Sequence, residues 1–252
     1  MLRKSWGLTL VGGLALTAAI AISAGLVNVR HVMFGSTIPL HEGDRIVALV
    51  AWNARSNASG DPSWRDVERW RESLRSVDGV SAFRTVRRRL AIADGAAQLV
   101  SVAEMTASGF ELARVAPRLG RPLIADDERE GAAPVVVIGY DTWRAQFASD
   151  PAVVGRRVRF DDTVRTVVGV MPEGFAFPVN HRFWTPLPSG PAGQGERERE
   201  NDATVFAFAR LAPGVTLEGA QAEVTTTGFL PVETASERDD PMQPRVVPYS
   251  LA

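Results

Sequence analysis

The stretch of sequence that decides the fold is Val153–Pro178, VVGRRVRFDDTVRTVVGVMPEGFAFP. Two short runs within it, Arg157–Phe160 and Val164–Val170, flank the polar pair Asp161-Asp162 and have the pattern of two strands joined by a turn. A loop with Met-Pro, Glu-Gly and two phenylalanines follows the second strand. None of these residues forms a catalytic pattern, so the question is whether the stretch builds the fold or marks a function.

The composition of the 252-residue chain is that of an ordinary globular protein, with 45% hydrophobic and 23% charged residues. This length suits one larger domain or two small ones. The net charge of −1 argues against a nucleic-acid partner, because a phosphate-binding surface needs an excess of basic residues. The chain has no cysteine, which excludes disulfides, thiolate metal sites and a cysteine nucleophile.

The N-terminal segment Trp6–Val29 is apolar and carries no charge. It is longer than the about 20 residues that an α-helix needs to cross the hydrocarbon core of a membrane. Arg3 and Lys4 precede it, and the positive-inside bias keeps such an end in the cytoplasm. We therefore predict a transmembrane helix at Trp6–Val29 that contacts lipid, with residues 30–252 outside the cytoplasm.

A cleaved signal peptide is the alternative for the same segment. Ala21–Ala24 offers small residues of the kind found at a cleavage site. The apolar run continues beyond this site through Leu26 and Val27, which favours an uncleaved anchor.

The rest of the chain contains several strand-like runs separated by turn residues. Asp94-Gly95 is typical of a hairpin turn. Segments 189–201 and 232–244 are polar and are expected to be loops. Besides the two strands of the opening stretch, we expect strands at Arg45–Trp52, Val80–Val86, Arg89–Ala93, Gln98–Met105, Pro134–Gly139, Thr204–Arg210 and Arg245–Pro248.

Helices are expected between these strands. The first is capped by Ser63, places Trp64, Val67, Trp70 and Leu74 on one face, and ends at Asp78-Gly79. The others are expected at Ser108–Leu112, Tyr140–Phe147 and Leu217–Leu230. The irregular order and the hairpin signals favour an α+β fold with mixed sheets over a doubly wound fold.

The residues that could carry chemistry do not form a recognisable site. His31, His41 and His181 lack metal-ligand spacing. Asp126–Glu128 is an acidic cluster whose oxygens would suit calcium, but it lacks the spaced D-x-D-x-D pattern. No nucleophile elbow and no phosphate-binding loop are present, so the chain should not bind ATP itself.

Two further groups have a structural and a functional interpretation. Arg87–Arg89 suits acidic partners or lipid headgroups, but a solvated strand end is the favoured interpretation. Trp64 and Trp70 suit a sugar-binding platform, but their spacing on an apolar helix face indicates core packing. We therefore predict no catalytic, cofactor-binding or metal-binding residue.

The opening stretch belongs to a longer motif. The run from Gly120 to Pro178 resembles the MacB-like periplasmic core domain of FtsX/MacB-type ABC transporter permeases. Within that family it is most similar to the duplicated permeases first described in acidobacteria. The matching residues are Gly120, Arg121, Pro134–Ile138, Trp143, Phe147, Asp150, Pro151, Val153–Gly155, Val168–Pro172 and Gly174–Pro178.

The resemblance extends over nearly the whole chain, with further matches at Phe183–Leu187, Ala209–Ala222 and Arg245–Pro248. The sequence departs from the family pattern in three places. Its hairpin turns on Asp161-Asp162 where the family has Asp-Gly, so we expect a longer or differently shaped turn. Gly139 replaces the usual serine, and segment 31–39 lacks the sequence pattern that usually follows the first span in the family.

The resemblance implies an extracytoplasmic domain, residues 30–252, built from two α+β subdomains and attached to the bacterial inner membrane. Such domains are not enzymes and need no cofactor. A separate cytoplasmic ABC ATPase drives the permease, and the domain transmits that motion to substrates or partner proteins. The family also implies a possible homodimer.

Three functions remain open from the sequence. The first is the extracytoplasmic module of an ABC-type permease, with this chain as the front part of a longer one, since further spans follow in the family. The second is a standalone, single-pass binding or adaptor protein. The third is an anchored hydrolase with a non-standard site, for which convergent acid–base groups are not visible. The transported substrate is not specified by any motif.

Overall fold

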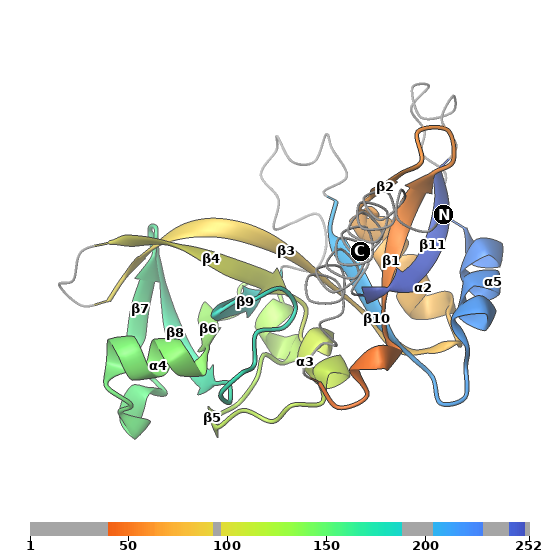
Figure 1. The fold of residues 1–252 in the computed structure, drawn as a ribbon. Coiled ribbons are helices and arrows are strands. Elements are labelled where there is room, and N and C mark those ends of the chain that lie inside the picture. The colour runs from red at the N-terminus through yellow and green to blue at the C-terminus, as the bar shows by residue number, and fades with distance from the viewer. Residues whose placement is uncertain (1–39, 93–96, 188–203, 229–241, 250–252) are drawn as a thin grey trace, which may run out of the picture.

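A computed structural model of the chain describes residues 40–92, 97–187, 204–228 and 242–249 (Figure 1). The predicted span Trp6–Val29, the turn Asp94-Gly95 and the loop 189–201 lie outside these residues. Among the helices that the structure describes, none has the length and hydropathy required to cross a membrane.

The described residues form one mixed sheet with helices on its faces. The strands are β1 (Ile46–Asn53), β2 (Ala58–Gly60), β3 (Val77–Ala91), β4 (Gln98–Met105), β5 (Leu119–Gly120), β6 (Val135–Ile138), β7 (Arg157–Phe160), β8 (Thr163–Val170), β9 (Phe183–Pro186), β10 (Phe206–Leu211) and β11 (Met242–Pro248). The helices are α2 (Trp64–Ser73), α3 (Ser108–Ala113), α4 (Tyr140–Phe147) and α5 (Leu217–Thr227).

The strand order is β11-β1-β10-β3-β4-β9-β6-β8-β5, with β2 beside β1. Two of the pairings, β4 with β9 and β6 with β8, are parallel, and the others are antiparallel. The mixed α+β architecture predicted from the sequence is therefore confirmed.

One half of the sheet closes on itself. Strand β7 pairs with β8 on one side and, through Leu90↔Phe160 and Ala91↔Arg159, with β3 on the other. Six strands, β3, β4, β9, β6, β8 and β7, thus form a closed circuit of pairings that we call the strand ring. Its core contains buried Leu90, Phe160 and Phe183, and α4 adds Trp143.

The other half of the sheet carries β11, β1, β10 and the start of β3, with α2 and α5 packed against it (Figure 1). Helix α2 begins where predicted. The Ser63 side chain accepts a hydrogen bond from the Asp66 N–H, and the Asp66 carboxylate accepts one from the Ser63 N–H. The four predicted inward residues are buried, and this confirms that Trp64 and Trp70 are core residues.

Helix α5 also holds the edge strand β11. The Gln221 side chain accepts a hydrogen bond from the Val246 N–H at 2.8 Å and donates one to the Pro244 carbonyl at 3.0 Å. Pro244 and Pro248 lie in β11 itself and have no N–H to donate. One side chain of the helix thus bonds to two positions of the edge strand, in addition to the apolar packing of Val246 against the helix.

A central aromatic core joins the two halves. It contains Phe175, Phe177, Trp184 and Phe208, with ring centroids 5.3 Å apart for Phe175 and Trp184 and 5.0 Å apart for Phe177 and Phe208. Phe175 and Phe177, from the loop after β8, therefore pack between the halves, while strand β8 itself belongs to the ring. The stretch builds the fold by contributing to both cores.

Two glycines of this motif allow the backbones of β5 and β8 to approach closely. Gly120 in β5 lies opposite Gly169 in β8. A Cβ at Gly120 would lie 2.1 Å from the Val168 carbonyl oxygen, and a Cβ at Gly169 would lie 2.1 Å from the Arg121 carbonyl oxygen. The backbones approach so closely that no side chain fits between them. Gly120 also has a φ of +67°, a conformation that favours glycine.

The structure corrects several predicted boundaries. The two predicted strands Val80–Val86 and Arg89–Ala93 are replaced by one strand, β3, which runs through both and ends at Ala91, because β10 pairs with its first half and β4 with its second half; Ala93 lies outside the described residues. Asp78-Gly79 lies in this strand and does not end α2, which stops at Ser73. Met242–Pro244, predicted to be part of a loop, begins β11.

The remaining elements agree with the sequence. Strands β1, β4, β6, β10 and helices α3 and α4 match their predictions to within about two residues. Helix α5 ends at Thr227, capped by Gly228. The hairpin between β7 and β8 is not lengthened by its second aspartate: Phe160 pairs directly with Thr163, and Asp161 adopts a φ of 50°.

Candidate functional site

The acidic cluster has structural partners. The Asp127 carboxylate accepts hydrogen bonds from both terminal nitrogens of Arg121, at 2.6 and 2.8 Å, and from the Ile124 N–H at 2.9 Å. Asp126 forms an exposed ion pair with Arg129, and Glu128 accepts a hydrogen bond from the N–H of residue 107. Within the part of the chain that the structure describes, no three His, Asp or Glu side chains are grouped to hold a metal ion.

The histidines also lie apart. His31 is outside the described residues, and His41 is exposed. His181 is buried, where Nδ1 accepts a hydrogen bond from the Val179 N–H, so that the proton on Nε2 points to the Thr85 hydroxyl at 3.0 Å. Burial lowers the pKa of His181 to about 4. His181 is therefore a neutral core residue at neutral pH.

The arginine triplet is divided between the two faces of β3. Arg87 and Arg89 point outward from the strand ring, on the side where β7 places Arg157 and Arg159, and all four are exposed. Arg88 points inward. This alternation follows from the two-residue period of a strand.

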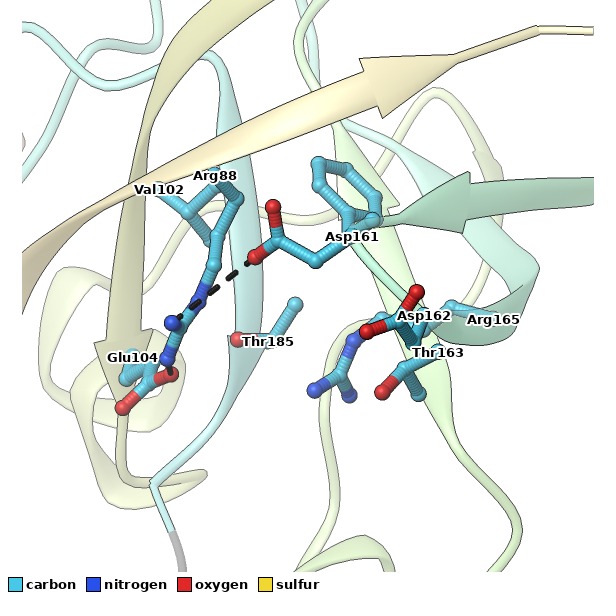
Figure 2. Close-up of a pocket in the computed structure, with 9 residues that line it drawn as sticks. Arg88, Val102, Glu104, Asp161, Asp162, Thr163, Arg165 and Thr185 are labelled. Carbon is cyan, nitrogen blue, oxygen red and sulfur yellow. Dashed lines mark hydrogen bonds and ion pairs between the residues drawn. The ribbon is translucent and has the colours of Figure 1, made fainter.

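A cavity of about 260 Å³ lies where the inward side of the strand ring turns polar (Figure 2). Five ring strands and the β7–β8 turn contribute to this ring cavity. It is lined by Arg88, Val102, Glu104, Phe160, Asp161, Asp162, Thr163, Arg165 and Thr185.

Glu104 is the centre of the charge network on one wall of the ring cavity. Its buried carboxylate accepts hydrogen bonds from Arg84 at 2.7 Å and from Arg88 at 2.9 Å. Arg88 also lies 3.8 Å from the Asp161 carboxylate, and Asp161 accepts a hydrogen bond from the Arg89 N–H. These charges are therefore compensated within the protein.

Arg165 and Thr185 on the cavity wall are less well compensated. The half-buried Arg165 guanidinium has one hydrogen bond to the described residues, to the Val135 carbonyl at 3.5 Å, and no ion pair with them. Its pKa is lowered by burial, with Glu104 and Arg88 acting in opposite directions. Thr185 is 2% exposed, and its hydroxyl has no hydrogen-bond partner among the described residues.

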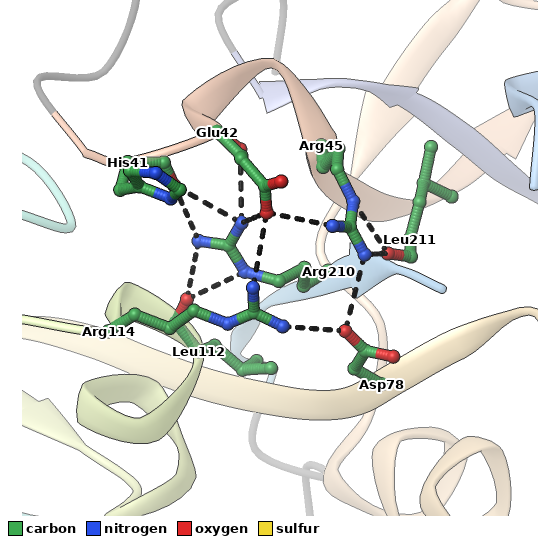
Figure 3. Close-up of polar contacts among 8 residues, drawn as sticks. All are labelled: His41, Glu42, Arg45, Asp78, Leu112, Arg114, Arg210 and Leu211. Atoms are coloured by element: carbon green, nitrogen blue, oxygen red, sulfur yellow. Dashed lines mark hydrogen bonds and ion pairs between the residues drawn. The ribbon is translucent and has the colours of Figure 1, made fainter. Parts of the chain in front are cut away.

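A second polar cluster lies where the described chain begins (Figure 3). Arg210 in β10 is 0% exposed and donates hydrogen bonds to three backbone carbonyls. The distances are 2.7 Å to Leu112, 3.0 Å to Glu42 and 3.3 Å to His41. One buried guanidinium thus ties the first described residues to α3 and β10.

Two carboxylates and two more arginines surround Arg210. Arg45 and Arg114 each contact both Glu42 and Asp78, at distances from 2.7 to 3.3 Å. Three guanidiniums against two carboxylates leave an excess positive charge, which the carbonyl oxygens solvate. We call these five side chains the arginine anchor. Burial, followed by the repulsion of Arg114 and Arg45, lowers the pKa of Arg210.

Neither the ring cavity nor the arginine anchor was predicted from the sequence. Arg210 occurs in a run of apolar residues, Phe206–Leu211, and a charged residue inside a strand covered on both faces is a signal that it has buried partners. The cavity has no comparable signal, because its walls come from segments separated by up to about 100 residues.

The profile of the MacB-like periplasmic core domain matches residues 8–227 of this chain. The match covers most of the sequence, and the chain belongs to this family. The resemblance inferred from the motif Gly120–Pro178 is thereby confirmed. A search of curated proteins finds no match.

Solved structures share the fold at low identity. A domain of a permease protein from Porphyromonas gingivalis has 16% identity and a TM-score of 0.59 over 81% of this chain and 90% of that one. The periplasmic region of MacB from Actinobacillus actinomycetemcomitans has 15% identity and a TM-score of 0.55, covering 72% and 81%. The extracellular domain of the noncanonic ABC-type transporter YknZ from Gram-positive bacteria has 10% identity and a TM-score of 0.56, covering 80% and 99%.

Proposed function

We propose that this chain is the extracytoplasmic module of an ABC-type permease, held in the inner membrane by Trp6–Val29 with its N-terminus in the cytoplasm. The family match over residues 8–227 carries this proposal. The module works with a cytoplasmic ABC ATPase in trans and couples ATP hydrolysis to the handling of a substrate or partner outside the cytoplasm. It carries out no chemistry of its own.

The attachment of the first and last described residues supports a mechanical role. Leu40, the first described residue, and Tyr249, the last, both pack against the central aromatic core. The Tyr249 hydroxyl donates a hydrogen bond to the Pro178 carbonyl at 3.0 Å. Forces applied by membrane helices at either end would therefore reach one packed core, and a close-packed core transmits displacement with little deformation.

The arginine anchor supports the same role at the N-terminal end. The carbonyls of His41 and Glu42 are fixed to Arg210, so these two residues cannot move without moving β10 and α3. The half with α2 and α5 and the half with the strand ring are the two subdomains of this proposal. The central core between them would receive the motion first.

The membrane topology can be tested with single cysteines, because the chain has none of its own. Leu99→Cys replaces a side chain that is 63% exposed on β4, and Ser5→Cys precedes the proposed span. In intact spheroplasts, a membrane-impermeant maleimide should label the cysteine at 99 and should label the cysteine at 5 only after lysis. The opposite pattern would reject the proposed orientation.

The coupling can be tested by co-expression with the ABC ATPase of the same organism. His41→Cys alters an exposed side chain and leaves the carbonyl that binds Arg210 in place. We expect the ATPase to co-purify with the chain and ATP to change the rate at which this cysteine is labelled. If neither occurs, the chain is a standalone adaptor in the membrane. Cross-linking of the same cysteine between two copies would report a homodimer.

A further inference from the structure

We propose that the ring cavity binds a small zwitterion of the amino-acid or short-peptide class, with its carboxylate on Arg165 and Thr185 and its ammonium group toward Asp162. This would be a binding function in addition to the proposed transmission of motion. It depends on the fold of the strand ring, and it does not depend on an ATPase partner.

The anionic end of the ligand follows from the unused donors of the cavity. The guanidinium of Arg165 has one long hydrogen bond, to a carbonyl, and no carboxylate partner among the described residues. The hydroxyl of the buried Thr185 lines the same cavity without a hydrogen-bond partner in that part of the chain. A half-buried guanidinium and a free hydroxyl on the walls of one cavity are donors suited to a carboxylate, and the planar guanidinium can donate two parallel hydrogen bonds to it.

The cationic end follows from the acidic residues of the cavity. Asp162 is exposed at the β7–β8 turn and has no ion pair with the described residues. Asp161 and Glu104 add two more carboxylates to the walls, although both have partners. A dianion such as phosphate would be repelled by these three groups, whereas a ligand with a positive end would compensate Asp162.

The size of the cavity limits the ligand. Its volume of about 260 Å³ is below the range of about 300–1,000 Å³ that holds drug-sized ligands. Val102 and Phe160 add a small apolar part to its walls. A position inside a closed circuit of strands also keeps the walls rigid, which lowers the cost of ordering the site on binding.

The test is calorimetric titration of the full chain in detergent with glycine and glycylglycine, and separately with acetate, methylammonium and inorganic phosphate. We expect one of the two zwitterions to bind more tightly than acetate, methylammonium and phosphate, which each carry charge of one sign only. Absence of heat with both zwitterions, or tighter binding of phosphate or acetate, would overturn the proposal.

Variants locate the binding. Arg165→Gln should weaken it about tenfold or more, since a charge-assisted hydrogen bond is lost, and Asp162→Asn should weaken it several-fold. Arg159→Gln is the matched control, because it removes an arginine from the outer side of the neighbouring strand β7. Equal losses in Arg165→Gln and Arg159→Gln would contradict the site.

A second variant covers the case in which Arg165→Gln does not fold. Thr185→Val is nearly isosteric and removes only the hydroxyl that faces the ligand. We expect a several-fold loss of affinity with an unchanged thermal midpoint. Unchanged affinity in this variant would exclude Thr185 from the site and overturn the proposed placement of the carboxylate.

Discussion

Replacing Arg210 by leucine tests whether the arginine anchor stabilises the domain. The substitution keeps an apolar stem in a site that is 0% exposed, but it removes the guanidinium that donates to the carbonyls of His41, Glu42 and Leu112; of these, the Glu42 carbonyl keeps one hydrogen bond, from the Arg45 N–H. It also leaves Glu42 with two arginine partners in place of three. Among the described residues, Arg210 is the only side chain that donates a hydrogen bond to the carbonyls of residues 41, 42 and 112. The substitution therefore leaves these carbonyls without a side-chain donor.

The magnitude follows from these contacts. An unsatisfied buried polar group costs about 1–3 kcal/mol, and removal of one member of a buried charged network costs about 3–5 kcal/mol. The contributions are not additive, and leucine regains part of the loss by apolar burial. We therefore expect Arg210→Leu to lower the free energy of unfolding by about 3–5 kcal/mol, a large share of the about 5–15 kcal/mol of a typical domain.

The assay is urea unfolding of the full chain in detergent, followed by tryptophan fluorescence, since Trp70 and Trp184 are fully buried. Arg129→Leu is the matched control. It removes the same group from an exposed ion pair with Asp126, and its effect should stay within about 0.5 kcal/mol. Trypsin adds a local readout, because Arg45 should be cleaved faster when the anchor is lost.

Two outcomes would refute the reasoning about Arg210. One is a loss of less than about 1 kcal/mol in Arg210→Leu, which would mean that water solvates the carbonyls as well as the guanidinium does. The other is an equal loss in Arg129→Leu, which would mean that the removal of any arginine charge destabilises the chain.

Three further predictions concern the cores. Gly169→Ala should destabilise the domain by about 1–3 kcal/mol or prevent folding, because its Cβ would lie 2.1 Å from the Arg121 carbonyl oxygen. Gly79→Ala is the control, because its Cβ would only contact Leu112 at 3.5 Å, and it should change thermal stability little. Equal effects of the two substitutions would exclude the close backbone approach as the cause. The His181 pKa is lowered from 6.5 to about 4, so the neutral ring contributes full stability above pH 6.5 and loses it as the pH falls toward 4. Between pH 7 and pH 4.5 the wild type should therefore lose about 2–3 kcal/mol more than His181→Gln in urea unfolding, and parallel losses would contradict the assignment. Glu104→Gln should lower the free energy of unfolding by about 1–2 kcal/mol. The loss is modest because Arg84 and Arg88 keep access to water. An unchanged free energy of unfolding would show that the shared carboxylate does not stabilise the domain through these two arginines.

The elements that could be predicted from the sequence are those with local signals. Helix α2 shows this, because the Ser63 cap and the spacing of Trp64, Val67 and Trp70 lie within one short segment. The hairpins β3–β4 and β7–β8 likewise depend on neighbouring residues. The length of β3 was missed, because it depends on β10 pairing with one half and β4 with the other.

The two candidate sites depend on contacts that no local pattern contains. The strand ring closes through Leu90 and Phe160, which are far apart in the chain. Arg210 meets His41 and Leu112 only after the whole sheet is assembled. The arginine triplet Arg87–Arg89 is easy to notice in the sequence, but its role is not predicted by the sequence alone. Only the alternation of side chains along β3 shows that Arg88 points inward and its two neighbours point outward.

The attachment of β11 to α5 has a consequence for association between chains. A strand at the edge of a sheet usually exposes a row of N–H groups that invites another strand to pair with it. At alternate positions of β11, Pro244 and Pro248 have no N–H, and the N–H of Val246 is occupied by Gln221. This border from 244 to 248 offers no free donor to an incoming strand. This edge is therefore closed to sheet extension, and two copies of the chain that meet would not pair strand to strand through it.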